Sequence, residues 1–220
     1  MQPNYWQQRW QENDIGFNQP GPTPLMLKHW PGLDLPPGTQ VFVPLAGKAF
    51  DMAWFAANGW PVFGVEVSQQ AVEQFFAEQS LVPQVRESPL GRHYIAGGIE
   101  LLCGDAFALD RPTLADCGAV FDRAALIALP PDMRQRYVRE LQTCLPAGCE
   151  GLLITLEYPQ HEKDGPPFSV DEPEVRELYG TDWEIDVLER RDILAAQPSF
   201  VAEGVTALDT VVYRLRRRPG

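Results

Sequence analysis

Short apolar runs alternate with helical patterns along most of the chain, from about residue 39 onward. Such runs, bounded by turn residues, are typical of buried strands. Near-continuous apolar strands that alternate with helices indicate a mostly parallel sheet covered on both faces. The pattern predicts seven strands, at Val41–Leu45, Val62–Val67, Ile99–Cys103, Ala119–Phe121, Gly151–Glu157, Trp183–Leu188 and Val205–Leu215.

Helices are predicted between these strands, because capping residues mark several of their ends. Ser68 and Asp171 are suited to begin a helix, Pro131 favours a first helical position, and Gly59 favours a helix end. The predicted helices are Asp51–Asn58, one that follows Ser68, one from Pro131 to Leu145 and a short one after Asp171.

The last two predicted strands have no long helix between them, which indicates an antiparallel hairpin at one edge of the sheet. Residues 83–98 are predicted to form a surface loop. The whole pattern predicts a Rossmann-like α/β fold, with a mostly parallel seven-stranded sheet and helices on both faces. In folds of this kind, ligands bind beyond the carboxyl ends of the strands.

Residues 1–35 differ from the rest of the chain. They carry Trp6, Trp10, Phe17 and Trp30 among glutamine, asparagine, glycine and proline. Exposed aromatic residues at this density are unfavourable unless they cover something. We therefore predict a helical or irregular N-terminal segment (1–35) that covers the ligand site of a single domain formed by residues 36–220.

Composition and charge restrict the classes of partner. The chain has 220 residues, 45% apolar and 22% charged, and a net charge of −12. An acidic surface repels phosphate backbones and anionic lipids, so we expect neither nucleic acid nor a membrane as partner. The short apolar runs and the absence of a signal-like N-terminus predict a cytoplasmic protein. The basic C-terminal cluster from Arg214 to Arg218 is interpreted as solvated charge.

Cysteine and histidine do not form a metal-binding pattern. The four cysteines, Cys103, Cys117, Cys144 and Cys149, include no C-x-x-C pair, and the three histidines are scattered. We expect reduced thiols and no metal site.

The first two predicted strands end in residues suited to a nucleoside ligand. Pro44-Leu45-Ala46-Gly47-Lys48 is a turn of mostly small residues, although it is neither a G-x-G-x-x-G nor a Walker A sequence. Glu66 ends the second strand about 20 residues later, where an acidic side chain can accept hydrogen bonds from ribose hydroxyls. Spacing alone leaves open whether Glu66 is instead a solvated residue at a strand end.

The third and fourth strands also end in polar residues. Asp105 follows Gly104, where a polar group can contact the edge of an adenine ring. Asp122 and Arg123 end the fourth strand, and a structural pairing between these two side chains is the alternative interpretation. No G-x-S-x-G or H-E-x-x-H sequence is present, so hydrolytic machinery is not indicated.

Several separate motifs, in order along nearly the whole chain, resemble the thiopurine S-methyltransferase family, and its bacterial branch most closely. They are Trp6-x-x-Arg9-Trp10 with Gly16-Phe17, Val43–Lys48 with Asp51-Met52 and Trp54, Gly64–Ser68, Phe121–Leu126 and Gly165–Phe168. One departure is visible: relatives commonly have cysteine where this chain has Ala46, so any role of that thiol is absent here.

The resemblance implies a class I methyltransferase fold and S-adenosyl-L-methionine as cofactor. Residue by residue, it implies that the cofactor contacts Trp10, Leu45, Glu66, Asp105, Ala106 and Arg123. It places Phe17 on the substrate side, and Phe168 is positioned to form part of the substrate wall. An indole face such as that of Trp10 can stabilise a sulfonium cation. No catalytic acid or base is assigned.

The implied reaction is methyl transfer to aromatic or heterocyclic thiols such as thiopurines, with selenium and tellurium compounds as a variant. Such thiols ionise near neutral pH, so the enzyme contributes mainly alignment and exclusion of water. Two alternatives stay open: a nucleotide-sugar or NAD-linked Rossmann enzyme, and a cofactor-binding module without activity. We expect a monomer.

Overall fold

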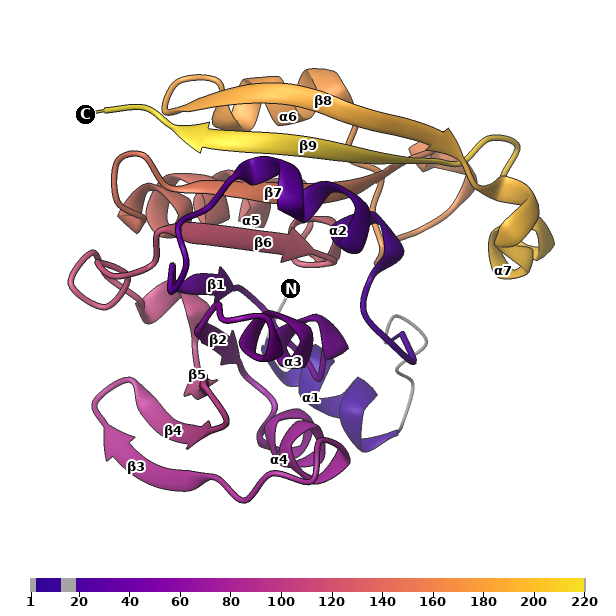
Figure 1. Cartoon of the computed structure of the whole chain (residues 1–220). Helices are drawn as coiled ribbons and strands as arrows, with labels where there is room; N and C mark the ends of the chain where they lie inside the picture. The colour runs from indigo at the N-terminus through magenta and orange to yellow at the C-terminus, as the bar shows by residue number, and fades with distance from the viewer. Residues whose placement is uncertain (1–2, 13–18, 220) are drawn as a thin grey trace.

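One continuous sheet forms the centre of the molecule in the computed structural model, which describes residues 3–12 and 19–219 (Figure 1). Within these residues the sheet has nine strands in the order β3-β4-β5-β2-β1-β6-β7-β9-β8. Five neighbouring strands are parallel: β5 (Ile99–Gly104), β2 (Val62–Glu66), β1 (Val41–Val43), β6 (Ala119–Arg123) and β7 (Glu150–Glu157). Antiparallel strands extend both edges: β3 (Gln84–Ser88) and β4 (Gly91–Ala96), and β9 (Asp209–Arg217) and β8 (Trp183–Asp192).

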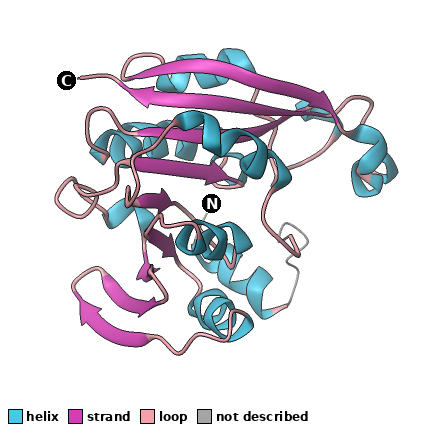
Figure 2. Cartoon of the chain, viewed as in Figure 1, coloured by secondary structure: helices cyan, strands magenta, loops and turns pink. Residues whose placement is uncertain are grey.

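Helices cover both faces of the sheet, as predicted (Figure 2). Residues of α2 (Pro24–His29), the 3-10 turn η1 (Trp30–Leu33), α3 (Phe50–Ala57) and α4 (Gln69–Glu78) form one apolar cluster with the sheet. Residues of α5 (Pro131–Arg136), the π-helical turn η4 (Tyr137–Leu141) and α6 (Glu172–Tyr179) form another. The remaining elements are α1 (Pro3–Gln11), α7 (Pro198–Ala202) and the 3-10 turns η2 (Ala106–Ala108), η3 (Leu126–Ala128), η5 (Gln142–Cys144), η6 (Gln160–Glu162) and η7 (Leu194–Ala196).

All seven predicted strands are present, and the antiparallel hairpin of β8 and β9 lies at one edge. The prediction of a surface loop at residues 83–98 was wrong, because β3 and β4 form a second hairpin there. Every residue of β3 is exposed or partly exposed, so the strand lacks the alternating burial that makes a strand recognisable. It is held by its backbone ladder to β4, which in turn pairs with β5.

The helix predicted from Pro131 to Leu145 is not continuous. Regular α-helix ends at Arg136, and a π-helical turn and a 3-10 turn follow. The Tyr137 hydroxyl at the start of the widened turn donates to the buried Asp122 carboxylate at 2.7 Å, and Gln142 donates to the same hydroxyl at 2.8 Å. This buried polar contact lies where the helix departs from regular geometry.

The N-terminal segment is held at two separate places. Met26, Trp30 and Leu33 are at most 3% exposed and belong to the apolar cluster that includes α3 and α4. Helix α1 lies beside α4 instead (Figure 1). The second part of the segment is therefore integrated into the core, whereas α1 contacts α4.

Candidate functional site

The turn that follows β1 is tied to the end of β2 by the Glu66 carboxylate. Its Oε2 accepts the Gly47 N–H at 2.8 Å, and its Oε1 accepts the Ser68 N–H at 2.7 Å. Leu45 and Gly47 both have positive φ, 48° and 53°, so the turn bends sharply. Burial raises the pKa of Glu66, and the N–H groups of Ser68 and Gly47 act in the opposite direction. Glu66 is therefore part of the turn's own structure, which sequence spacing did not reveal.

Trp10 packs directly on this turn. The residue is 2% exposed, and a Cβ placed on Gly47 would lie 3.3 Å from its Cζ2 atom. Its carbonyl accepts a hydrogen bond from the Gln70 side chain of α4 at 3.1 Å. Trp10, Leu45 and Glu66, three residues predicted from sequence to contact the cofactor, thus surround one turn at the carboxyl ends of β1 and β2.

Asp105 and Ala106 follow the end of β5, the strand next to β2. The exposed Asp105 caps η2 by accepting the Phe107 N–H at 2.9 Å through Oδ1, while Ala106 is buried. Glu66 and Cys103 are direct partners in the β2–β5 ladder, so Asp105 lies beyond the same edge of the sheet as Glu66.

Arg123 ends β6 and is electrostatically coupled to Asp51, a residue that our sequence analysis did not assign to the site. Burial lowers the pKa of Arg123, and the negative charge of Asp51 acts in the opposite direction. Asp51 is 2% exposed and lies in the first turn of α3. Its carboxylate accepts hydrogen bonds from the Thr23 N–H at 2.7 Å and the Thr23 hydroxyl at 3.2 Å. The signal that was available is an acidic residue inside the Asp51-Met52 motif.

The neighbouring Asp122 forms hydrogen bonds with residues other than Arg123. Its carboxylate accepts the Tyr137 hydroxyl and, at 3.1 Å, the Leu126 N–H. Burial raises the pKa of Asp122 to about 6. These bonds identify Asp122 as a residue that shapes the loop after β6.

The ring of Phe168 is engaged by residues of the protein itself. The Arg134 guanidinium lies 5.5 Å from the ring centroid, and a Cβ on Gly165 would lie 2.3 Å from the ring. The Phe168 N–H donates to the Ile127 carbonyl at 2.7 Å, which joins this loop to the end of β6. Phe17, predicted on the substrate side, lies outside the described residues.

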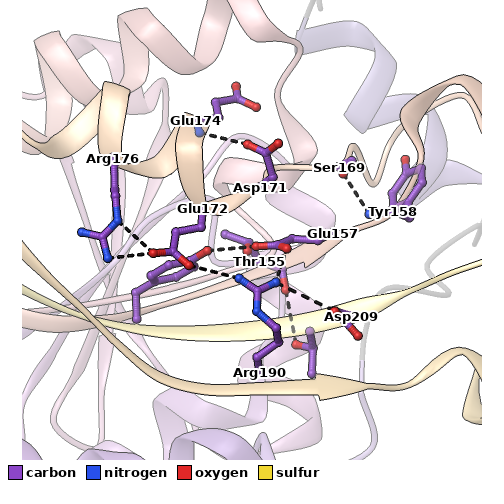
Figure 3. A network of polar contacts seen from close by, with 12 residues as sticks. Thr155, Glu157, Tyr158, Ser169, Asp171, Glu172, Glu174, Arg176, Arg190 and Asp209 are labelled. Carbon is purple, nitrogen blue, oxygen red and sulfur yellow. Dashed lines mark hydrogen bonds and ion pairs between the residues drawn. The ribbon is translucent and has the colours of Figure 1, made fainter.

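A network of charged side chains joins the β8–β9 hairpin to β7 and α6, the elements on either side of this loop (Figure 3). Arg190 of β8 contacts Glu157 at the end of β7, and its guanidinium lies 3.2 Å from Glu172 of α6 and 3.9 Å from Asp209. Next to Glu157, the Tyr158 hydroxyl donates to the Pro167 carbonyl at 2.6 Å. The hairpin therefore contacts β7 and α6, the elements before and after the loop that carries Phe168, and Tyr158 contacts the loop itself.

Residues 3–12 and 19–219 contain neither a metal-binding cluster nor a membrane-spanning helix. No group of three or more histidine, cysteine, aspartate or glutamate side chains there is arranged to hold a metal ion. None of the helices in that part of the chain has the length and apolar character to cross a membrane.

The fold and the strand-end site define a class. Leaving out the β3–β4 hairpin and numbering the other seven strands along the chain gives the order 3-2-1-4-5-7-6. A solved N1-methyltransferase of Burkholderia thailandensis, with bound S-adenosylhomocysteine, superposes with a TM-score of 0.65 at 16% identity, covering 99% of this chain and 87% of that one. A methyltransferase of Anabaena variabilis superposes with a TM-score of 0.64 at 15% identity, covering 98% and 95%. The fold is that of the class I S-adenosylmethionine-dependent methyltransferases.

The family model "Thiopurine S-methyltransferase (TPMT)" matches residues 1–218. Curated relatives with the name thiopurine S-methyltransferase are 57% identical in Nitrosomonas eutropha and 55% identical in Bordetella parapertussis, each over 99% of both chains. A relative of that name from Xanthomonas campestris is 57% identical over 99% of this chain and 100% of its own. The chain belongs to the thiopurine S-methyltransferase family, and with it to the methyltransferases that use S-adenosyl-L-methionine.

Proposed function

We propose that this protein transfers a methyl group from S-adenosyl-L-methionine to the sulfur of small aromatic or heterocyclic thiols, thiopurines among them. The observation that carries the proposal is the 55–57% identity, over nearly the full length, to relatives named for this activity. Methylation of selenium or tellurium compounds is a variant of the same chemistry and is an outcome of the test below.

The residues at the strand ends suit this cofactor chemically. A carboxylate has about four acceptor positions, and the N–H groups of Gly47 and Ser68 take two of those of Glu66. The others suit two ribose hydroxyls. Oδ1 of Asp105 accepts the Phe107 N–H, and the other carboxylate oxygen suits the amino group of adenine as a hydrogen-bond acceptor. The cofactor residues we propose are Trp10, Leu45, Glu66, Asp105, Ala106 and Arg123.

The bound cofactor supplies an electrophilic methyl group on a sulfonium centre. The Trp10 indole supplies a π face for this positive charge, a contact worth about 0.5–2 kcal/mol. Arg123 offers a cation for the cofactor carboxylate or for an incoming thiolate, and the negative charge of Asp51 favours the charged form of Arg123. A thiolate, formed by loss of the thiol proton to solvent, would take up this methyl group by in-line displacement, with the thioether of the cofactor as the leaving group. Phe168 contributes to the substrate wall.

We further propose that the N-terminal segment covers this site and excludes water from it. The contacts of Trp10 with Gly47 and of Thr23 with Asp51 support this role, because both flank the turn after β1. The expectation that the protein binds neither nucleic acid nor membranes rests on the charge of −12. A cytoplasmic location and a monomeric state also remain part of the proposal.

Calorimetry with S-adenosylhomocysteine, followed by a thiol panel with methyl-labelled cofactor, tests the proposal. We expect binding and label transfer to heterocyclic thiols, with selenium compounds as a parallel arm. Binding without transfer to any thiol or selenium compound would favour a non-catalytic module. Binding of a dinucleotide instead would favour the NAD-linked alternative.

A further inference from the structure

A chain of hydrogen bonds crosses the β3–β4 hairpin. The buried His93 of β4 lies with Nε2 2.7 Å from Ser88 Oγ and with Nδ1 2.6 Å from Glu100 Oε1 of β5. Arg86 of β3 donates to the same glutamate oxygen at 2.6 Å. Because a carboxylate only accepts, Nδ1 donates to Glu100, and Nε2 forms a hydrogen bond with the Ser88 hydroxyl. The chain thus links the turn of the hairpin to β5.

Ser88 uses its remaining hydrogen-bonding capacity to close that turn. Its Oγ accepts the Leu90 N–H at 3.1 Å and lies 3.3 Å from the Gly91 carbonyl oxygen. A serine, histidine and glutamate in hydrogen-bonded sequence resemble a hydrolytic triad. Here, however, the hydroxyl oxygen is already an acceptor within a two-residue turn, which indicates a role in holding backbone rather than in attacking a substrate.

The closed turn lies against the carboxyl end of β5, immediately before Asp105. Gly91 and Gly104 are direct partners in the β4–β5 ladder. A Cβ on Gly91 would lie 2.1 Å from the Cys103 carbonyl oxygen, and one on Gly104 would lie 2.4 Å from the Leu90 carbonyl oxygen. The two backbones therefore approach more closely than any side chain at either position would allow.

The hairpin also reaches the other side of the proposed nucleoside site. Arg92 Nη1 lies 3.4 Å from Oε1 of Gln69, the first residue of α4, which follows the Glu66 end of β2. Leu90 packs on the same apolar cluster as Leu45 and Phe107. The hairpin therefore bounds the ends of β2 and β5 on the side away from β1.

We propose that the β3–β4 hairpin is the outer wall of the adenosine part of the cofactor site, and that Ser88 and His93 are positioning residues which hold its turn against Asp105. This inference rests on the proposed function for the identity of the ligand. The hydrogen-bond chain acts through the turn, and we assign Ser88 and His93 no contact with the reacting atoms.

Matched variants test the individual hydrogen bonds among Ser88, His93 and Glu100. Ser88→Ala and His93→Asn break the bond to the turn, whereas His93→Gln has an amide that reaches the Nε2 position and preserves it. Arg86→Gln breaks only the exposed ion pair with Glu100 and is the control. The readouts are calorimetric Kd values for S-adenosylhomocysteine and 5′-methylthioadenosine, and kcat and KM for the thiol at saturating cofactor.

We expect Ser88→Ala and His93→Asn to raise both Kd values roughly three- to tenfold, the loss expected for one hydrogen bond. Thiol KM and kcat should stay unchanged, and His93→Gln and Arg86→Gln should bind like the wild type. Wild-type Kd values in Ser88→Ala and His93→Asn would overturn the proposal, as would a parallel change in thiol KM. Because binding is measured without turnover, failure of the thiol reaction alone would not affect this result.

Discussion

At the scale of single residues, the site is built from buried acids that serve the protein's own backbone. Glu66 joins two turns, and Asp51 joins α3 to the N-terminal segment. Burial raises the pKa of both carboxyl groups. Their hydrogen bonds offset this desolvation, because a buried carboxylate without partners is strongly unfavourable. Substitution of either residue therefore affects structure as well as binding.

Glu66 gives the first prediction. Glu66→Ala should weaken S-adenosylhomocysteine binding by about 1.5–3 kcal/mol, the range for charge-assisted hydrogen bonds. It should also lower the free energy of unfolding by about 1–3 kcal/mol, because the N–H groups of Gly47 and Ser68 lose their acceptor. Calorimetry and denaturant unfolding measure the two effects, and Glu66→Gln, which keeps one acceptor oxygen, should reduce the second. An unchanged Kd in Glu66→Ala would remove this residue from the site.

Asp122 gives a prediction about pH. Its pKa is raised to about 6 in the folded protein, above 3.8 in the unfolded chain. The folded state therefore holds the proton more tightly, so this contribution to stability is complete below pH 3.8 and is lost as pH rises through about 6. Asp122→Asn is neutral throughout. The free energy of unfolding of Asp122→Asn minus that of the wild type should therefore increase by on the order of 3 kcal/mol between pH 4 and 7.

Urea unfolding of both proteins at a series of pH values measures this difference. Asp51 and Glu66 are present in both proteins, so their titration cancels in the comparison. Stability curves that run parallel from pH 4 to 7 would show that Asp122 is not the group responsible.

At the scale of elements, the N-terminal segment divides into two parts with different attachments. Trp30 and its neighbours belong to the core, and Thr23 is fixed by Asp51. Helix α1 is attached through Trp10 and the side of α4. The segment we proposed as a cover for the site is therefore expected to detach, if at all, only upstream of Thr23.

Deletion of residues 1–20 tests this cover. The truncated protein should fold, because Met26, Trp30 and Leu33 are retained, but it should bind cofactor weakly and transfer little or no methyl group. In the intact chain, S-adenosylhomocysteine should protect Trp6 and Trp10 from proteolysis and their amides from hydrogen exchange. Full turnover by the truncated protein, or equal protection with and without ligand, would favour static packing instead.

At the scale of the whole molecule, the two antiparallel hairpins flank the parallel strands at opposite edges of the sheet (Figure 1). Arg190 joins the β8–β9 hairpin to Glu157 of β7 and Glu172 of α6, which lie on either side of the loop that carries Phe168. The β3–β4 hairpin contacts the start of α4 and the end of β5. The site at the carboxyl ends of the parallel strands thus has an antiparallel hairpin on each side.

Metal independence is a prediction for the whole reaction. Displacement of a thioether from a sulfonium by a thiolate develops no negative charge that a Lewis acid would need to stabilise. Thiol methylation should therefore be unchanged after incubation with excess chelator. Loss of activity that a divalent ion restores would contradict the prediction, and a chelator-treated sample dialysed into metal-free buffer is the control.

The sequence by itself determined the parallel strands, the turn at Leu45–Gly47 and the family. These features depend on neighbouring residues in the sequence. A short apolar run favours a buried strand, and the family motifs keep fixed spacings along the chain. The prediction of a surface loop at residues 83–98 was wrong because β3 buries few side chains. The strand is held by its backbone hydrogen bonds to β4, which leave no pattern in the sequence.

Only the tertiary structure decided which residues meet. Thr23 and Asp51 are 28 residues apart, and Gly47 and Glu66 are 19 apart, yet each pair forms a buried hydrogen bond. Ser88, His93 and Glu100 come together only because β3, β4 and β5 pair in a specific register. Such contacts depend on crossovers between strands, and no local pattern of apolar and polar residues records them.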